Sequence, residues 1–153
     1  MEHKIKSIRP FIGAKNFEES RRFYADLGFQ ETELGHNMSI FTIHDFAFYL
    51  QNAYVKDWID NTMIFLEVDD VSRYWHELSA LKLDTKYKGV RLTAIKEHDW
   101  GKECFLHDPS GILWHFGEFF KWLWNRQLRY EYPLSIFTQN AFLNAFFLEI
   151  WRK

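Results

Sequence analysis

The fold of this chain is decided by one stretch, residues 98–116, which reads HDWGKECFLHDPSGILWHF. Cysteine, phenylalanine and leucine at 104–106 form a short apolar run, and the Asp-Pro-Ser-Gly sequence at 108–111 then supplies the residues of a tight turn. The proline fixes φ at the second turn position, and the glycine tolerates positive φ. Residues 112–116 return as a strand rich in aromatic side chains. The stretch therefore predicts a β-hairpin.

Two segments of the chain show the same predicted order of elements, namely a strand, a helix and three more strands. The first segment, residues 5–51, begins with a strand at 7–14 that Pro10 interrupts. Asn16 is placed as the N-cap of a helix that ends near Leu27. Three short strands follow this helix, at 29–34, 38–43 and 46–50.

The second segment, residues 62–118, repeats this order after a polar linker. It has a strand at 62–68, a helix capped by Asp69 or Asp70, and a strand-like region at 87–95 that precedes the hairpin. A repeat of this size can define a whole fold. The sequence therefore predicts an α+β protein built from two βαβββ modules.

Composition excludes several classes of protein. The chain has 153 residues and a formal charge of −2, which gives no reason to expect a partner that is a nucleic acid or a membrane surface. It has no apolar run long enough to span a bilayer, and residues 1–9 lack the apolar core of a secretory signal. The single cysteine, Cys104, excludes an internal disulfide and suits a reducing cytoplasm, where we expect the protein to act.

The hairpin stretch carries further recognisable sequence, because Trp-Gly-Lys-Glu at 100–103 leads into it and His-Phe at 115–116 ends it. The other positions that share the pattern are Pro10, 19–24, 27–29 and 60–62. Together they resemble the bleomycin resistance proteins, a branch of the vicinal-oxygen-chelate (glyoxalase-like) superfamily. The resemblance covers about residues 5–118, so we expect one domain at 1–118 and a separate extension at 119–153.

The resemblance implies a binding protein. The branch that this chain resembles consists of homodimers that exchange their first strand and hold a drug in two aromatic-lined clefts. Pro10 matches the proline at the exchange position, and exchange of such an element is a low-cost route to a dimer. A homodimer that binds a small molecule is therefore expected.

The presence of a metal site distinguishes the metalloenzymes of the superfamily from this branch. These enzymes place His, Gln or Glu at four strand positions around a divalent ion. The resemblance places these positions near Arg9, Met63, Phe48 or Tyr49, and His115. Only the histidine could act as a ligand. We therefore expect no metal and no other cofactor.

The same resemblance predicts the ligand-binding residues. Trp100 matches a tryptophan that lines the drug cleft, Phe65 stands where a second tryptophan is found, and Met38 stands where another aromatic residue is found. His115 is interpreted either as a hydrogen-bonded histidine on a sheet face or as a ligand contact. Glu118 follows the last strand and is the acid predicted nearest the cleft.

The predicted mechanism is sequestration of a small aromatic compound, without bond breaking. The net acidic charge of residues 5–118 slightly favours a cationic ligand. Cys104 has no neighbour that would activate its thiol, and no phosphate-binding glycine loop or nucleophile triad is visible. Two alternatives stay open: a metal-dependent lyase or dioxygenase with ligands around His115 and Glu118, and a dimeric scaffold whose tail makes the functional contact.

The tail, residues 119–153, lies outside the resemblance. It contains 11 aromatic residues, five Lys or Arg and two Asp or Glu. Pro133 separates two stretches that are predicted to be helical. The tail is predicted to pack on the domain or on a dimer partner, since exposed aromatic surface favours aggregation. Alternatively, the tail contacts a membrane or another protein, or it is an extension of little function.

Overall fold

The computed structural model of the protein describes residues 4–120. The chain divides into two units, residues 1–119 and 120–153. The predictions for the tail, which concern its helices, its packing and its contacts, therefore lie outside the described residues, except for Phe119 and Phe120. None of the helices in residues 4–120 is both long and apolar enough to cross a membrane.

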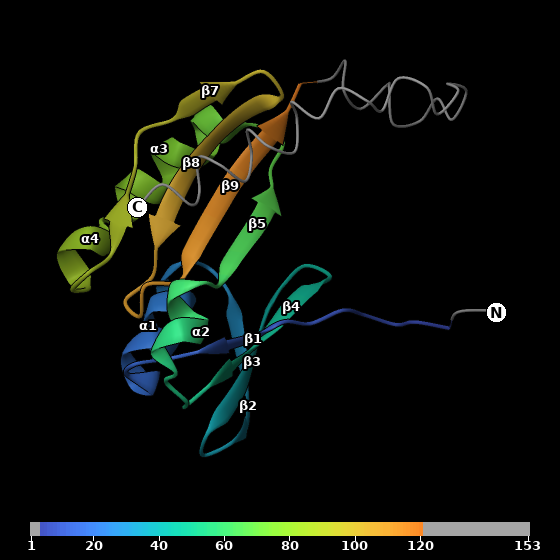
Figure 1. The fold of residues 1–153 in the computed structure, drawn as a ribbon, viewed down its shortest axis with the longest axis vertical. Coiled ribbons are helices and arrows are strands. Elements are labelled where there is room, and N and C mark those ends of the chain that lie inside the picture. The colour runs from blue at the N-terminus through green and yellow to red at the C-terminus, as the bar shows by residue number, and fades with distance from the viewer. Residues whose placement is uncertain (1–3, 121–153) are drawn as a thin grey trace. The chain divides into compact units, whose positions relative to one another are not determined.

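The first module forms a four-stranded sheet with the strand order β1-β4-β3-β2 (Figure 1). Its elements are β1 (Phe11–Gly13), α1 (Phe17–Asp26), β2 (Gln30–Gly35), β3 (Met38–Ile43) and β4 (Phe46–Gln51). The pairs β2–β3 and β3–β4 are antiparallel, whereas β1 returns parallel to β4. The predicted strand at 7–14 is too long, because only 11–13 pair with β4.

The second module forms a sheet with the order β5-β9-β8-β6, and β7 also pairs with β8. Its elements are β5 (Met63–Glu67), α3 (Val71–Leu81), α4 (Leu83–Lys86), β6 (Arg91–Leu92), β7 (Lys96–His98), β8 (Gly101–His107) and β9 (Leu113–Phe119). The strands β8 and β9 make the hairpin that the central stretch predicts, with Gly111 at a φ of 105°. The α+β fold of two βαβββ modules is therefore confirmed.

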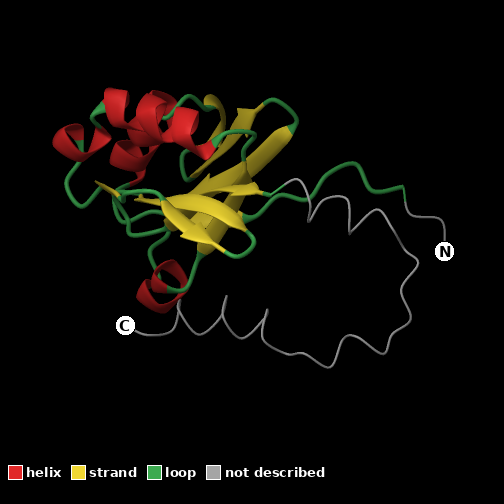
Figure 2. Ribbon diagram, turned by 90° about the horizontal axis from the view of Figure 1, so that it is seen from above, coloured by secondary structure: helices red, strands yellow, loops and turns green. Residues whose placement is uncertain are grey.

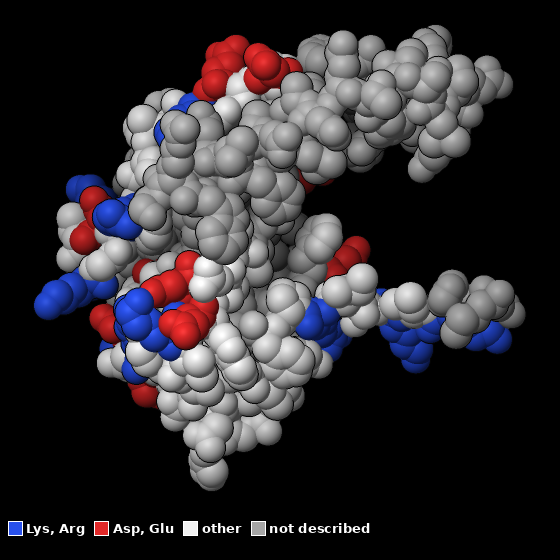
Figure 3. All heavy atoms as spheres, in the orientation of Figure 1, with Lys and Arg blue, Asp and Glu red and all other residues white. Residues whose placement is uncertain are grey.

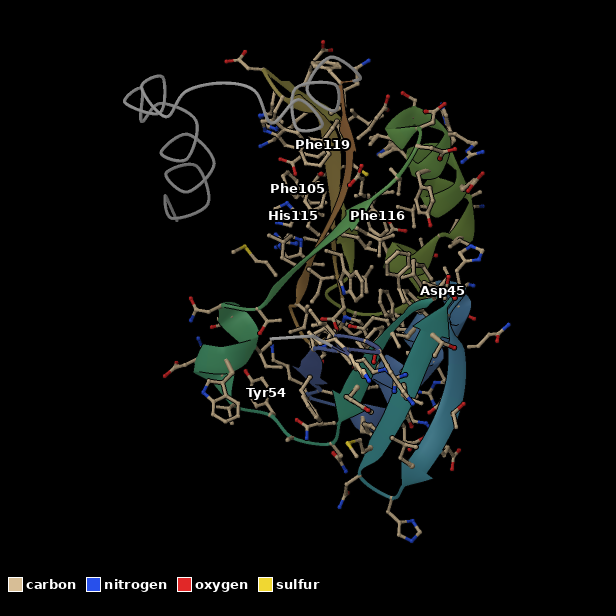
Figure 4. The ribbon with its side chains drawn as sticks, turned by 90° about the vertical axis from the view of Figure 1, so that its right-hand side faces the viewer. Asp45, Tyr54, Phe105, His115, Phe116 and Phe119 are labelled. Atoms are coloured by element: carbon tan, nitrogen blue, oxygen red, sulfur yellow. The ribbon has the colours of Figure 1, made fainter. Side chains whose placement is uncertain are left out.

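Two segments differ from the prediction. The strand expected at 87–95 is reduced to β6, because Gly89 takes a φ of 88° and interrupts any extended run there. The polar linker contains a short helix, α2 (Lys56–Asp60), which lies on the opposite side of the strands from α3 (Figure 4).

Both long helices begin as the sequence predicts. The Asn16 side chain accepts a hydrogen bond from the Glu19 amide at 3.1 Å, and the Asp70 side chain accepts one from the Arg73 amide at 2.9 Å. Each contact satisfies a backbone N–H that the first helical turn leaves without a partner. In α1 the side chains that turn inward are Phe17, Ser20, Phe23 and Tyr24.

The two modules share one hydrophobic core. Trp114 of β9 is 1% exposed, and its ring lies 5.5 Å from that of Phe48, 5.7 Å from that of Phe29 and 5.8 Å from that of Tyr24. These three partners all belong to the first module. Figure 2 shows most helices gathered over one side of the strands, where this core lies.

A buried polar contact also joins the modules. Asp108, at the start of the hairpin turn, accepts hydrogen bonds on Oδ1 from the backbone amides of Ser110, Gly111 and Ile112. Its Oδ2 accepts a hydrogen bond of 2.7 Å from the hydroxyl of Tyr24 on α1. The turn residues therefore fix the hairpin and also anchor it to the first module.

Residues 4–10 form an arm that leaves the first module and runs away from both sheets (Figure 1). Ile5 and Ile8 are 69% and 87% exposed. Basic side chains alternate with them, and they are visible along the arm in Figure 3. Within residues 4–120, only the end of the arm pairs with a strand, through the Pro10 carbonyl and the Tyr49 amide.

Candidate functional site

The sheet of the second module has two chemically different faces. Neighbouring side chains of a strand point to opposite faces. Phe116 of β9 points toward the helices, where it stacks on Tyr74 of α3 at 5.4 Å. His115 and Phe119 lie on the other side of the same strand, together with Phe105 of β8 (Figure 4). The helix-covered face belongs to the core, whereas the other face is the candidate site.

We call this second surface the aromatic face; it is formed by Phe65, Trp100, Phe105, His115 and Phe119. The rings of Phe65, Trp100 and Phe119 form a triangle, with centroids separated by 5.2 to 6.1 Å. Phe65 and Phe119 are 37% and 38% exposed. Rings that are half-exposed on a rigid sheet offer an apolar stacking surface to a planar molecule.

Gly117 of β9 makes room for the ring of Phe65. A Cβ atom at this position would lie 2.2 Å from Cζ of Phe65. The ring therefore lies across the β9 backbone next to His115, at a centroid distance of 6.1 Å. The absence of a side chain at 117 lets the phenylalanine on β5 reach the middle of the face.

Trp100 is positioned by a two-residue turn between β7 and β8. His98 pairs with Gly101 across this turn, so residues 99 and 100 form its tip. The indole is nearly parallel to the His98 imidazole, with an interplanar angle of 3° and a centroid distance of 5.3 Å. A Cβ at Gly101 would lie 2.0 Å from the Glu118 carbonyl oxygen, so glycine is required where β9 passes this turn.

A buried carboxylate lies beside the aromatic rings. Glu103 of β8 is 5% exposed, and His115 is 4% exposed. Oε2 of Glu103 is 3.0 Å from Nδ1 of His115, in hydrogen-bond geometry. Oε1 is 3.0 Å from Nε2 of His98, at an angle that does not make a hydrogen bond. The carboxylate is thus held between two imidazoles, and the hydrogen bond from His115 compensates part of the cost of its burial.

The structure brings together three of the five predicted site residues: Phe65, Trp100 and His115. Met38 lies on β3, in the sheet of the first module. Glu118 lies on the helix-covered face, where Oε2 accepts a hydrogen bond of 3.1 Å from the Val71 amide at the start of α3. This hydrogen bond stabilises the start of α3.

Sequence reasoning missed Glu103, His98 and Phe119 as parts of this face. The signal that could have found Glu103 and Phe119 is the alternation of side chains along the hairpin. His115 pairs with Phe105, so Glu103 two residues before Phe105 and Phe119 four residues after His115 share its face. His98 could not be placed in this way, since it depends on the tight turn at 99–100.

The residues at the positions where the fold family holds a metal do not fit one. Met63 offers a thioether and Arg9 a cation, and the Arg9 guanidinium donates instead to the Tyr49 hydroxyl at 3.3 Å. His115 is then the only residue of this set that offers a suitable ligand atom, and one imidazole does not hold a metal ion. Within residues 4–120, no group of three or more His, Cys, Asp or Glu side chains is arranged to hold a metal ion.

Cys104 is suited to the core and not to nucleophilic chemistry. Its side chain is buried on the helix-covered face, and this burial raises the pKa of its thiol to about 11. A thiol of that kind stays protonated at neutral pH, and the thiolate is the reactive form.

No protein-family model matches the chain, and no curated protein is significantly similar to it in sequence. Solved structures with a similar fold were found. A bleomycin-binding protein from Streptomyces verticillus, complexed with copper(II)-bleomycin, is 22% identical with a TM-score of 0.63; the match covers 75% of this chain and 97% of that one. The fold is that of the bleomycin-binding proteins.

Other solved structures of this glyoxalase-like fold differ in their described function. An antibiotic-binding protein from a Streptomyces species is 17% identical with a TM-score of 0.61, and the match covers 78% of this chain and 100% of that one. A lactoylglutathione lyase from Agrobacterium tumefaciens is 16% identical with a TM-score of 0.55, and the coverage is 76% and 96%. The fold is therefore shared by binding proteins and an enzyme, and function must be argued from the site.

Proposed function

We propose that this protein binds and sequesters a small aromatic compound on its aromatic face, without chemical conversion. The observation that carries the proposal is the triangle of Phe65, Trp100 and Phe119, three rings within 6.1 Å of one another on a sheet whose other face is packed into the core. Planar ligands stack on such rings, and aromatic contacts add to the energy of apolar burial. Sequestration lowers the free concentration of the compound by equilibrium binding alone.

One exposed carboxylate near the rings supports a cationic ligand, whereas the ammonium of Lys96, which lies over the Phe105 ring at 5.5 Å, acts against it. Glu67 follows Phe65 by two positions on β5, so its carboxylate lies on the same face, and it is exposed. A cation would meet both this negative charge and the negative faces of the aromatic rings. Two of the solved structures with this fold are described as bleomycin-binding and antibiotic-binding proteins, which is consistent with this ligand class.

The proposed active form is a homodimer. A second copy of the chain would supply a wall opposite the aromatic face and so enclose the ligand. The arm at 4–10, with Ile5 and Ile8 exposed, supports exchange of the N-terminal strand between the two copies. Met38 would contribute from the sheet of the first module, where a thioether gives adaptable apolar contact.

Calorimetric titration with bleomycin and with acridine orange, a planar cation, tests the binding proposal. Trp100→Ala is expected to weaken binding of the ligand at least about fivefold, which corresponds to about 1 kcal/mol of lost stacking. Trp58→Ala is the matched control, because Trp58 on α2 is 73% exposed and makes no part of the aromatic face. Absence of binding by either compound, or equal losses in the two variants, would contradict the proposal.

A further inference from the structure

We propose that Glu103 is a positioning residue that orients His115 to accept a hydrogen bond from the bound compound. The aromatic face would then select ligands in which an N–H or O–H group is attached to the aromatic ring. This inference rests on the proposed function, since it concerns the specificity of the same face. It adds a polar contact that the stacking rings do not provide.

The first step concerns the proton of His115. A carboxylate can only accept hydrogen bonds, so the Nδ1 atom that lies 3.0 Å from Oε2 of Glu103 must carry the hydrogen. In a neutral imidazole the other nitrogen, Nε2, then has a free lone pair. Glu103 in this way determines both the ring orientation and the tautomer of the histidine, as carboxylates do when they bond to ligand-binding histidines.

The second step concerns the surroundings of Nε2. His115 is 4% exposed, and its ring is flanked by the rings of Phe65 at 6.1 Å and Phe105 at 4.8 Å. Within residues 4–120, the hydrogen bond of His115 is made by Nδ1, and Nε2 is not among the fully buried atoms left without a partner, so it stays accessible at the face. An acceptor that a bound ligand shields from water and leaves without a partner typically costs 1–3 kcal/mol, so Nε2 favours a ligand that brings a donor.

The third step concerns what the ligand must carry. Phe65 lies next to His115, so a planar compound stacked on Phe65 brings its edge near the imidazole. An apolar edge would leave the lone pair unpaired, whereas an N–H or O–H group satisfies it. A site that holds a buried acceptor discriminates against analogues that lack the donor.

Two neutral bicyclic compounds test the inference, 2-naphthol and 2-methoxynaphthalene, which differ only in the methyl group that removes the O–H donor. The wild-type protein is expected to bind 2-naphthol about fivefold more tightly, as measured by chemical-shift titration. His115→Phe and Glu103→Met are expected to abolish this preference while still binding both compounds. Glu103→Gln, which keeps a carbonyl acceptor for Nδ1, is expected to restore part of it.

The control is Glu97→Gln on β7. Glu97 is exposed and pairs with Lys102, so it lies on the face opposite to Glu103, and the variant should keep the wild-type preference. Equal binding of the two compounds by the wild type would overturn the inference and leave the proposed function intact. Binding of neither compound would also overturn the inference, while the titrations with bleomycin and acridine orange decide the proposed function separately. A preference that survives in His115→Phe would place the acceptor elsewhere and would also overturn the inference.

Nitrogen-15 spectra of the imidazoles provide a readout that a merely structural role would not move. In the wild type, His115 is expected to show the chemical shifts of a neutral ring protonated on Nδ1, and the Nε2 signal should shift when 2-naphthol is added. In Glu103→Met the ring is expected to lose this tautomer preference. A wild-type ring protonated on Nε2 alone would contradict the inference without any ligand.

Discussion

Asp108 shows at the scale of one residue why the Asp-Pro-Ser-Gly turn is specific. Its carboxyl group is 1% exposed and accepts four hydrogen bonds, three from the turn backbone and one from Tyr24. Burial disfavours the charged form and is the largest effect, so the pKa of Asp108 rises from 3.8 to about 6, although each of the hydrogen bonds acts in the opposite direction. An apparently local turn residue thus titrates inside the core.

We predict that Asp108 makes the protein less stable as the pH rises from about 4 to about 6. In this range the unfolded chain has released the proton of Asp108 while the folded chain still holds it, so stability falls with pH and is constant above this range. The displacement from 3.8 to about 6 corresponds to at most about 3 kcal/mol. Urea unfolding of the wild type and of Asp108→Asn, at pH values from 4 to 8, measures the effect.

The Asn variant isolates this residue, because it keeps a carbonyl acceptor for the turn amides and does not titrate. The difference in unfolding free energy, wild type minus variant, should decrease between pH 4 and 6 and then stay level. A difference that increases with pH would mean that the four hydrogen-bond donors outweigh burial and hold the group ionised.

At the scale of elements, the order of strands and helices could be predicted from the sequence, whereas the faces of the strands could not. Hydrophobic periodicity, helix-capping residues and turn residues are local signals, and they predict α1, α3 and the β8–β9 hairpin correctly. Which side of the second sheet meets α3 depends on long-range packing. His115 and Phe116 are adjacent in sequence, and nothing local indicates which of them faces α3. Phe116 is the one that packs against Tyr74.

The same limit explains the candidate site. Phe65, Trp100 and His115 were predicted through a family resemblance, and the structure brings them together. Glu103 and Lys102 are adjacent in β8 and so point to opposite faces of the sheet, but this alternation does not say which face meets the helices. The contact with His115 crosses to β9 and follows from the register of the hairpin, which turn residues alone do not determine.

Glu118 provides a prediction at this scale. Its carboxylate accepts from the first amide of α3, so Glu118→Ala is expected to lower the unfolding free energy by about 1 kcal/mol and to leave the affinity for acridine orange unchanged. Urea unfolding and calorimetric titration measure the two quantities. Glu77→Ala is the control, since Glu77 is exposed on α3 and makes a long ion pair with Arg73. A loss of affinity at unchanged stability would return Glu118 to the binding site.

At the scale of the whole molecule, the two modules differ in what they contribute. The first module supplies most of the aromatic partners that bury Trp114, and the second carries the aromatic face. Both depend on the hairpin, which holds Asp108 at one end and lies beside Trp100 at the other. A change in the hairpin should therefore affect stability and ligand binding together, whereas a change at an exposed position of α2, such as Trp58, should affect neither.

The arm makes the proposed homodimer testable by a single substitution. Ile8 is 87% exposed, so it adds almost nothing to the stability of one described chain, but it would be buried if the arm is exchanged. Burying an isoleucine is worth about 1.5–3 kcal/mol, so Ile8→Ser is expected to weaken dimerisation at least about tenfold without changing the unfolding of the monomer. Light scattering coupled to size exclusion, over a dilution series, measures the dimer, and Lys6→Ser controls for a change in the same arm that removes no apolar surface.

If the ligand is enclosed between two copies, the affinity for acridine orange should decrease along with dimerisation. A wild-type chain that stays monomeric, or an Ile8→Ser variant that dimerises as tightly as Lys6→Ser, would mean that the arm does not join two copies and that the aromatic face binds its ligand as an open surface.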